Sequence, residues 1–158
     1  MFVLIRAVTY AALFIGLVLV FVPARVLSAA GIARPEAVGL LQVSGMMIGA
    51  TGAVVALGCV LAFALVGRGT PAPFDPPRRL VIRGPYRHVR NPMYIGAGLA
   101  LAGAALYYQS LELLGYAVVF LVVVYLFVVF HEEPTLKRSF GADYTAYCRT
   151  VRRWWPKL

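Results

Sequence analysis

The chain has 158 residues, of which 61% are hydrophobic and 13% are charged, with a net charge of +9. So large an apolar share excludes an ordinary soluble domain and is typical of an integral membrane protein. The length leaves no room for a separate soluble catalytic domain, and the basic excess comes without a nucleic-acid-binding motif, so we expect no nucleic-acid partner.

Four apolar segments are long enough to cross a bilayer, which takes about twenty residues per helix. They run from 2 to 22, from 37 to 66, from 93 to 108 and from 113 to 130. The first is longer than the apolar part of a signal peptide and lacks a good cleavage site, so we expect a retained span that closes at Pro23. The sequence therefore predicts an all-α integral membrane protein with about four transmembrane helices in a single domain.

The last two spans are separated by only four residues, Gln109 to Glu112, which predicts an antiparallel helical hairpin. Small residues recur every four positions on the second and third spans, and such stripes let helices approach closely in lipid. These residues are Gly45, Gly49 and Ala53, then Gly96, Ala100 and Ala104.

Basic residues predict the orientation. Six Lys and Arg lie in the loop at 67–92 and six in the tail at 131–158, whereas the opposite side would hold only Arg25 and Arg34. By the positive-inside rule the loop, the tail and both termini are cytoplasmic, as in a multi-pass protein of a bacterial inner membrane. Both basic segments would also lie against membrane lipids.

The loop contains a short β-like run at 78–82, a turn at Gly84-Pro85, and then Asn91-Pro92 at the start of the third span. Asn is a preferred helix cap and Pro suits the first helical position. The free amides of this helix start, reinforced by Arg87 and Arg90, predict an anion site.

Two adjacent carboxylates, Glu132 and Glu133, follow the fourth span. In the hairpin they come close to the start of the third helix and its arginines. His88 and His131 lack a third ligand, so we expect no metal, and Cys59 and Cys148 form no motif. A basic pocket, aromatic rings and a carboxylate for a ribose diol suit S-adenosylmethionine, but they also suit a nucleotide.

Three blocks of residues resemble the isoprenylcysteine carboxyl methyltransferase and phospholipid methyltransferase family of membrane enzymes. The resemblance spans about 78–156. The blocks are Leu80-Val81 with Gly84-Pro85-Tyr86, Arg90-Asn91-Pro92-Met93-Tyr94 and Gly96; the Glu132-Glu133 pair; and Phe140-Gly141, Tyr144, Tyr147, Val151, Arg153 and Pro156.

The resemblance implies transfer of a methyl group from S-adenosylmethionine to a lipophilic or lipid-linked acceptor, with the cytoplasmic loop and tail folded over the cofactor. Glu133 and Arg153 are then the candidate catalytic residues, and Glu133 or His88 would receive a proton from an amine or thiol acceptor. The implied cofactor-binding residues are Arg78, Arg79, Leu80, Val81, Tyr86, Arg90, Asn91, Pro92, Met93, Tyr94 and Glu132.

Two positions depart from the family's pattern. Asn91 replaces a His, and Val128 stands where the prenylcysteine enzymes have an Arg that contacts the acceptor. The acceptor therefore stays open between a prenylcysteine-type carboxylate, a lipid amine, a thiol and a quinone-like phenol. Two other functions also stay open: a sterol-reductase-like enzyme that uses NADPH, and a non-enzymatic protein that binds anionic lipid.

Overall fold

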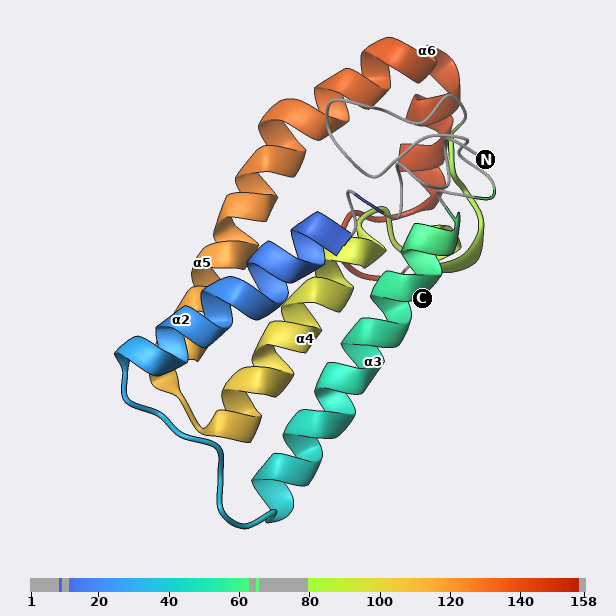
Figure 1. Ribbon diagram of the computed structural model, residues 1–158. Helices are drawn as coiled ribbons and strands as arrows, with labels where there is room; N and C mark the ends of the chain where they lie inside the picture. The colour runs from blue at the N-terminus through green and yellow to red at the C-terminus, as the bar shows by residue number, and fades with distance from the viewer. Residues whose placement is uncertain (1–8, 10–11, 63–64, 66–79, 157–158) are drawn as a thin grey trace.

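The computed structural model describes residues 9, 12–62, 65 and 80–156, and these residues form helices and their connections (Figure 1). In chain order the elements are η1 (Ile15–Phe21), α2 (Val22–Ala29), α3 (Leu40–Ala62), η3 (Gly84–Arg87), α4 (Pro92–Tyr108), α5 (Leu111–Phe127), η4 (Val128–Glu132) and α6 (Glu133–Thr150). Within this part of the chain there is no β-strand, and the described end of the expected β-like run, 80–82, is irregular. The predicted all-α fold is confirmed.

Within the described ranges, three helices are long and apolar enough to cross a membrane: Ala12–Ala29, Leu40–Ala62 and the apolar part of Leu111–Thr150. The expected span at 93–108 corresponds to α4, whose 17 residues extend about 26 Å, slightly less than the roughly 30 Å hydrocarbon core. The start of the first expected span, the end of the second and the loop to residue 79 lie outside the described residues, apart from residues 9 and 65. The chain is a multi-pass membrane protein in which α4 lies between α3 and α5 (Figure 1).

The sequence predicted that the first span closes at Pro23, but the helix continues through this residue to Ala29. The π-helical η1 leads directly into α2, and the N–H of Val22 bonds five residues back to the carbonyl of Leu17. The wider π turn accommodates a proline inside the helix. Because Pro23 has no N–H, the carbonyl of Val18 five residues before it accepts a hydrogen bond from the Tyr116 hydroxyl of α5 instead, at 2.9 Å.

The predicted hairpin between α4 and α5 is confirmed. Gln109 ends α4 in the left-handed conformation with φ of 50°. Ser110 then caps α5, because its hydroxyl oxygen accepts a hydrogen bond from the Leu113 amide at 3.0 Å. A turn this tight fixes α5 antiparallel to α4 and brings the end of α5 back to the start of α4.

Glycines bring α3 and α4 into backbone contact. A Cβ added at Gly45 would lie 2.6 Å from the carbonyl oxygen of Gly103, and one added at Gly96 would lie 2.7 Å from that of Gly52. The prediction of small-residue contact was right for Gly45, Gly49, Gly96 and Ala100, but its strict four-residue period was wrong beyond them. Helices turn 3.6 residues per turn, so Gly52 and Gly103 occupy the interface and Ala53 is exposed.

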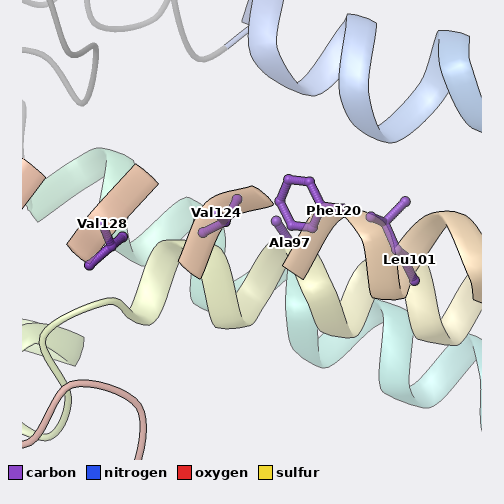
Figure 2. Close-up of a cluster of buried hydrophobic side chains, with 6 residues drawn as sticks. Ala97, Leu101, Phe120, Val124 and Val128 are labelled. Carbon is purple, nitrogen blue, oxygen red and sulfur yellow. The ribbon is translucent and has the colours of Figure 1, made fainter. Parts of the chain in front are cut away.

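A cluster of buried side chains joins α4 to α5 (Figure 2). Leu101 and Val128 are 1% and 0% exposed, and Phe120 and Val124 lie between them along α5. Most of the other large side chains of α5 are exposed, which is the pattern of a helix that faces lipid. The cluster therefore fixes α4 against α5. The loop and the tail pack at one end of this helix pair.

The chain reverses inside α6 at Gly141, where φ is 50° and ψ is −118°. Few residues other than glycine tolerate this conformation. The reversal carries the second half of α6 and the tail back toward the start of α4 (Figure 1). Tyr144, Tyr147 and Val151 form a buried cluster there with Leu80 of the loop.

Candidate active site

The loop before α4 is packed into the protein by Tyr86. Its ring is 7% exposed and lies in a buried cluster with Val81 and Cys59. The Tyr147 hydroxyl of α6 donates to the Tyr86 carbonyl at 2.7 Å, which ties the loop to the tail helix. Burial raises the pKa of the Tyr86 phenol well above its usual value, so this side chain is neutral at any physiological pH.

The start of α4 lies where the sequence predicted, at Pro92, but Asn91 does not cap it. The Asn91 side chain makes no hydrogen bond to the first turn and instead donates from Nδ2 to the carbonyl of Arg153 at 3.2 Å. The reason is the returning tail, which offers a backbone acceptor beside the helix. The Asn91 side chain therefore leaves the first turn of α4, which contains Met93 and Tyr94, without a cap among the described residues.

Glu132 faces this first turn. The Tyr94 hydroxyl donates to the Oε2 atom of Glu132 at 3.0 Å. Glu132 lies beyond the apolar run that ends at Phe130, and burial raises the pKa of its carboxyl, while the hydrogen bond from Tyr94 lowers it and the neighbouring charge of Glu133 raises it. The Glu132 carboxylate is thus held near the N-terminal end of α4, called the entrance of α4 below, by the neutral phenol of Tyr94.

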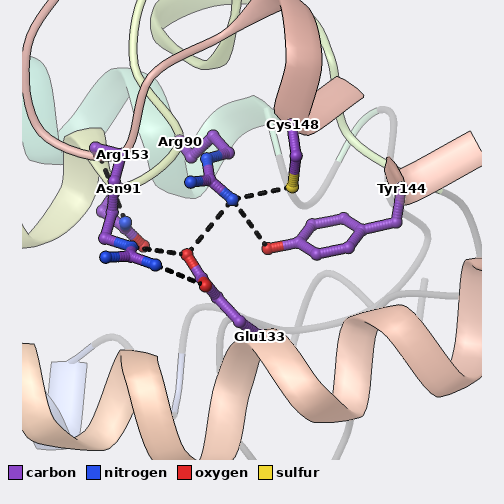
Figure 3. Close-up of polar contacts among 6 residues, drawn as sticks. All are labelled: Arg90, Asn91, Glu133, Tyr144, Cys148 and Arg153. Atoms are coloured by element: carbon purple, nitrogen blue, oxygen red, sulfur yellow. Dashed lines mark hydrogen bonds and ion pairs between the residues drawn. The ribbon is translucent and has the colours of Figure 1, made fainter. Parts of the chain in front are cut away.

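Glu133 has different partners and lies between two arginines (Figure 3). Arg153 makes a two-pronged contact, with Nε 2.7 Å from Oε1 and a terminal nitrogen 2.8 Å from Oε2. Arg90 approaches Oε1 at 3.1 Å and also donates to the Tyr144 hydroxyl and the Cys148 sulfur. The hydrogen bonds to Glu133 raise the pKa of Arg153, which holds a full charge there.

The structure thus divides the predicted site residues among three places. Arg90, Asn91, Glu133 and Arg153 are in contact with one another, and Tyr94 contacts Glu132. Val81 and Tyr86 share a buried cluster that Met93 borders. Arg78 and Arg79 lie outside the described residues.

Tyr144, Cys148 and the carbonyl of Arg152 also belong to this site, although no role was predicted for them from the sequence. Tyr144 and Cys148 are four residues apart on one face of α6 and both contact Arg90, and the Arg152 carbonyl accepts from the Arg90 amide at 2.9 Å. The four-residue spacing was visible in the sequence. The identity of the partner was not, because it depends on the reversal at Gly141.

An open groove of about 700 Å³ lies between the loop and α6. Of the predicted cofactor-binding residues in the described ranges, only Leu80 lines it. The other lining residues are Ile82, Phe140, Asp143, Ala146, Tyr147 and Thr150. Within the same ranges, no three His, Cys, Asp or Glu side chains are grouped so that they could hold a metal ion.

The residues at the start of α4 fit the chemistry of S-adenosylmethionine. The cofactor carries hydroxyls, a positive centre and a carboxylate. Glu132 supplies a half-buried acceptor, Tyr94 supplies an aromatic ring, and the uncapped first turn of α4 supplies amides. The Nε of Arg90 is a buried donor without a hydrogen-bond partner among the described residues.

Neither the curated proteins nor the solved structures give a match to this chain. The phospholipid methyltransferase family matches residues 40–143, from the first residue of α3 into the second half of α6. This match covers well over half of the chain and includes the loop, the start of α4 and both glutamates. The chain therefore belongs to the phospholipid methyltransferase family and is a membrane methyltransferase.

Proposed function

We propose that this methyltransferase uses S-adenosylmethionine as its methyl donor and a membrane-dissolved, lipophilic molecule as its acceptor. The observation that supports this most is the Tyr94–Glu132 pair. A carboxylate is costly to remove from water, and one whose pKa is raised by burial is typical of a group placed for a use. Its position beside an uncapped helix start gives it that use, as the acceptor for ribose hydroxyls.

The bound cofactor would supply an activated methyl group, and the protein would supply alignment. Glu132 would bind the ribose, and the face of Tyr94 would attract the positive centre. The first turn of α4 and Arg90 would bind the carboxylate. Holding donor and acceptor in line is worth several kcal/mol of barrier, so alignment would be the protein's main contribution to the transfer.

The charge distribution supports a cytoplasmic site. Of the Lys and Arg in the described ranges, two lie on α2 and in the α2–α3 loop, at or near the hairpin end. The other eight lie in the loop before α4, on α6 or in the tail, at the end where Glu132 lies (Figure 1). These eight are Arg83, Arg87, Arg90, Lys137, Arg138, Arg149, Arg152 and Arg153. By the positive-inside rule these charges support a cytoplasmic position for this end, and the exposed apolar side chains of α5 support an acceptor that arrives from the bilayer.

Calorimetric titration of the purified protein in detergent with S-adenosylhomocysteine tests the proposal. We expect micromolar binding by the wild type and at least about tenfold weaker binding by Glu132→Ala, since a hydrogen bond to a charged group contributes about 1.5–3 kcal/mol. Glu36→Ala is the matched control, because Glu36 is exposed in the connection between α2 and α3.

Two results would count against the proposal. Binding by NADPH and not by S-adenosylhomocysteine would favour a reductase. Failure of a well-folded wild type to bind either compound, together with binding to anionic vesicles that survives Arg90→Lys, would favour a lipid-binding protein.

A further inference from the structure

The tail after α6 is attached to the entrance of α4 at several points. The amide of Arg90 donates to the carbonyl of Arg152 at 2.9 Å, and Asn91 donates from its side chain to the carbonyl of Arg153 at 3.2 Å. Val89 and Arg152 pair as in a parallel sheet. The tail thus runs beside the last residues before α4.

Glu133, the first residue of α6 and the neighbour of Glu132, contacts both the loop and the tail. It is 19% exposed and accepts from Arg153 of the tail through both oxygens, and from Arg90 of the loop through one. Two-pronged contacts of this kind fix orientation as well as distance. One carboxylate therefore holds the loop and the tail together (Figure 3).

The tail is also held by Trp154. Its ring stacks on Tyr125 of α5, with centroids 6.3 Å apart, and packs against the cluster that contains Val128. The indole nitrogen is buried and has no hydrogen-bond partner among the described residues, so packing and stacking hold this ring in place.

We propose, on the basis of the function proposed above, that Glu133 and Arg153 are positioning residues that clamp the tail over the entrance of α4. Both carboxylate oxygens of Glu133 are occupied by guanidinium groups. A proton could therefore bind to Glu133 only by displacing an ion pair. Because Glu132 and Glu133 are adjacent, the clamp also sets where Glu132 meets Tyr94. The clamp thereby orders the cofactor site without touching the reacting atoms.

The tail contains both tryptophans of the chain, Trp154 and Trp155, so its attachment can be observed directly. Trp155 is 76% exposed and is replaced by Phe, which leaves Trp154 as the only reporter. In this background Arg153→Ala should shift the emission of Trp154 to longer wavelength and increase its quenching by acrylamide. Arg153→Lys keeps the charge but loses the two-pronged contact, and should give a partial effect.

Arg152→Ala is the matched control. It removes the same charge one residue away, from an exposed side chain, and leaves the backbone contact with Arg90 in place. Its Trp154 emission and its affinity for S-adenosylhomocysteine should equal those of the parent. The Arg153→Ala variant should bind S-adenosylhomocysteine about five- to tenfold more weakly, with unchanged helical circular dichroism, and Arg153→Lys should restore part of the loss.

The double variant Glu133→Ala, Arg153→Ala should be no worse than the worse single variant, because the two side chains act as one unit. Unchanged Trp154 emission and quenching in Arg153→Ala would overturn the clamp. Release of the tail without loss of affinity would overturn the positioning role. If the parent itself did not bind S-adenosylhomocysteine, the proposed function would fail, while the fluorescence would still decide whether the clamp exists.

Discussion

Substituting alanine for Gly103 is expected to force α3 and α4 apart. A Cβ at this position would lie 2.6 Å from the carbonyl oxygen of Gly45 and 2.7 Å from the Cα of Gly49. Ordinary contact distances begin near 3.4 Å, so the helices would have to separate by about 1 Å. Both neighbours are backbone atoms and cannot rotate away.

The expected magnitude follows from two opposing effects. Overpacking of this kind costs about 1–3 kcal/mol, and the upper part of that range applies because backbone meets backbone. Alanine gains up to about 1 kcal/mol over glycine in helix propensity. We therefore expect Gly103→Ala to lower the free energy of unfolding by about 1–2 kcal/mol, and to weaken cofactor binding because α4 carries Tyr94.

The assay is denaturation of the purified protein in mild detergent, followed by far-ultraviolet circular dichroism. Gly115→Ala on α5 is the control, because a Cβ there meets nothing within 4 Å and shows the propensity gain alone. Equal unfolding midpoints for the two variants would refute the reasoning that α3 and α4 are held in backbone contact.

Three further substitutions test the site and the tail. Tyr94→Phe removes the hydrogen bond to Glu132 and should cost about 1–3 kcal/mol of cofactor-binding free energy, seen by calorimetry; unchanged affinity would contradict the role of this pair. Because burial raises the pKa of Glu132, its carboxyl takes up a proton at higher pH than a free glutamic acid does, so affinity for S-adenosylhomocysteine should fall as the pH is lowered and this carboxylate is lost. Glu132→Gln should flatten that dependence, and an equal slope in this variant would assign it to another group. Gly141→Ala meets no clash but forces alanine to a φ of 50°, and should destabilise the turn by about 1–3 kcal/mol, read out as increased quenching of Trp154; unaltered quenching would contradict the strain argument.

The helical framework could be predicted from the sequence because its determinants are local. A proline at the first helical position marks the start of α4, and a short connection, four residues by the expected spans and two in the structure, forces the hairpin. The end of the first helix could not be predicted. Its continuation through Pro23 depends on a hydrogen bond from Tyr116, which lies nearly a hundred residues away.

The two glutamates show the same limit within the site. The sequence places them together, but adjacent helical residues point about 100° apart, so Glu132 meets Tyr94 while Glu133 meets Arg90 and Arg153. Which glutamate takes which partner depends on the returning tail. That return is set by the conformation of a single residue, Gly141, which no periodic pattern in the sequence reveals.

Methyl transfer by purified protein tests the central claim most directly. The protein is reconstituted into vesicles made from a native membrane lipid extract and supplied with S-adenosylmethionine that carries a labelled methyl group. We expect label to accumulate in the organic-soluble fraction with the wild type and with Glu36→Ala, and to fall to background with Glu132→Ala. Equal labelling by the wild type and Glu132→Ala, or no labelling by a wild type that is folded and reconstituted, would contradict the account.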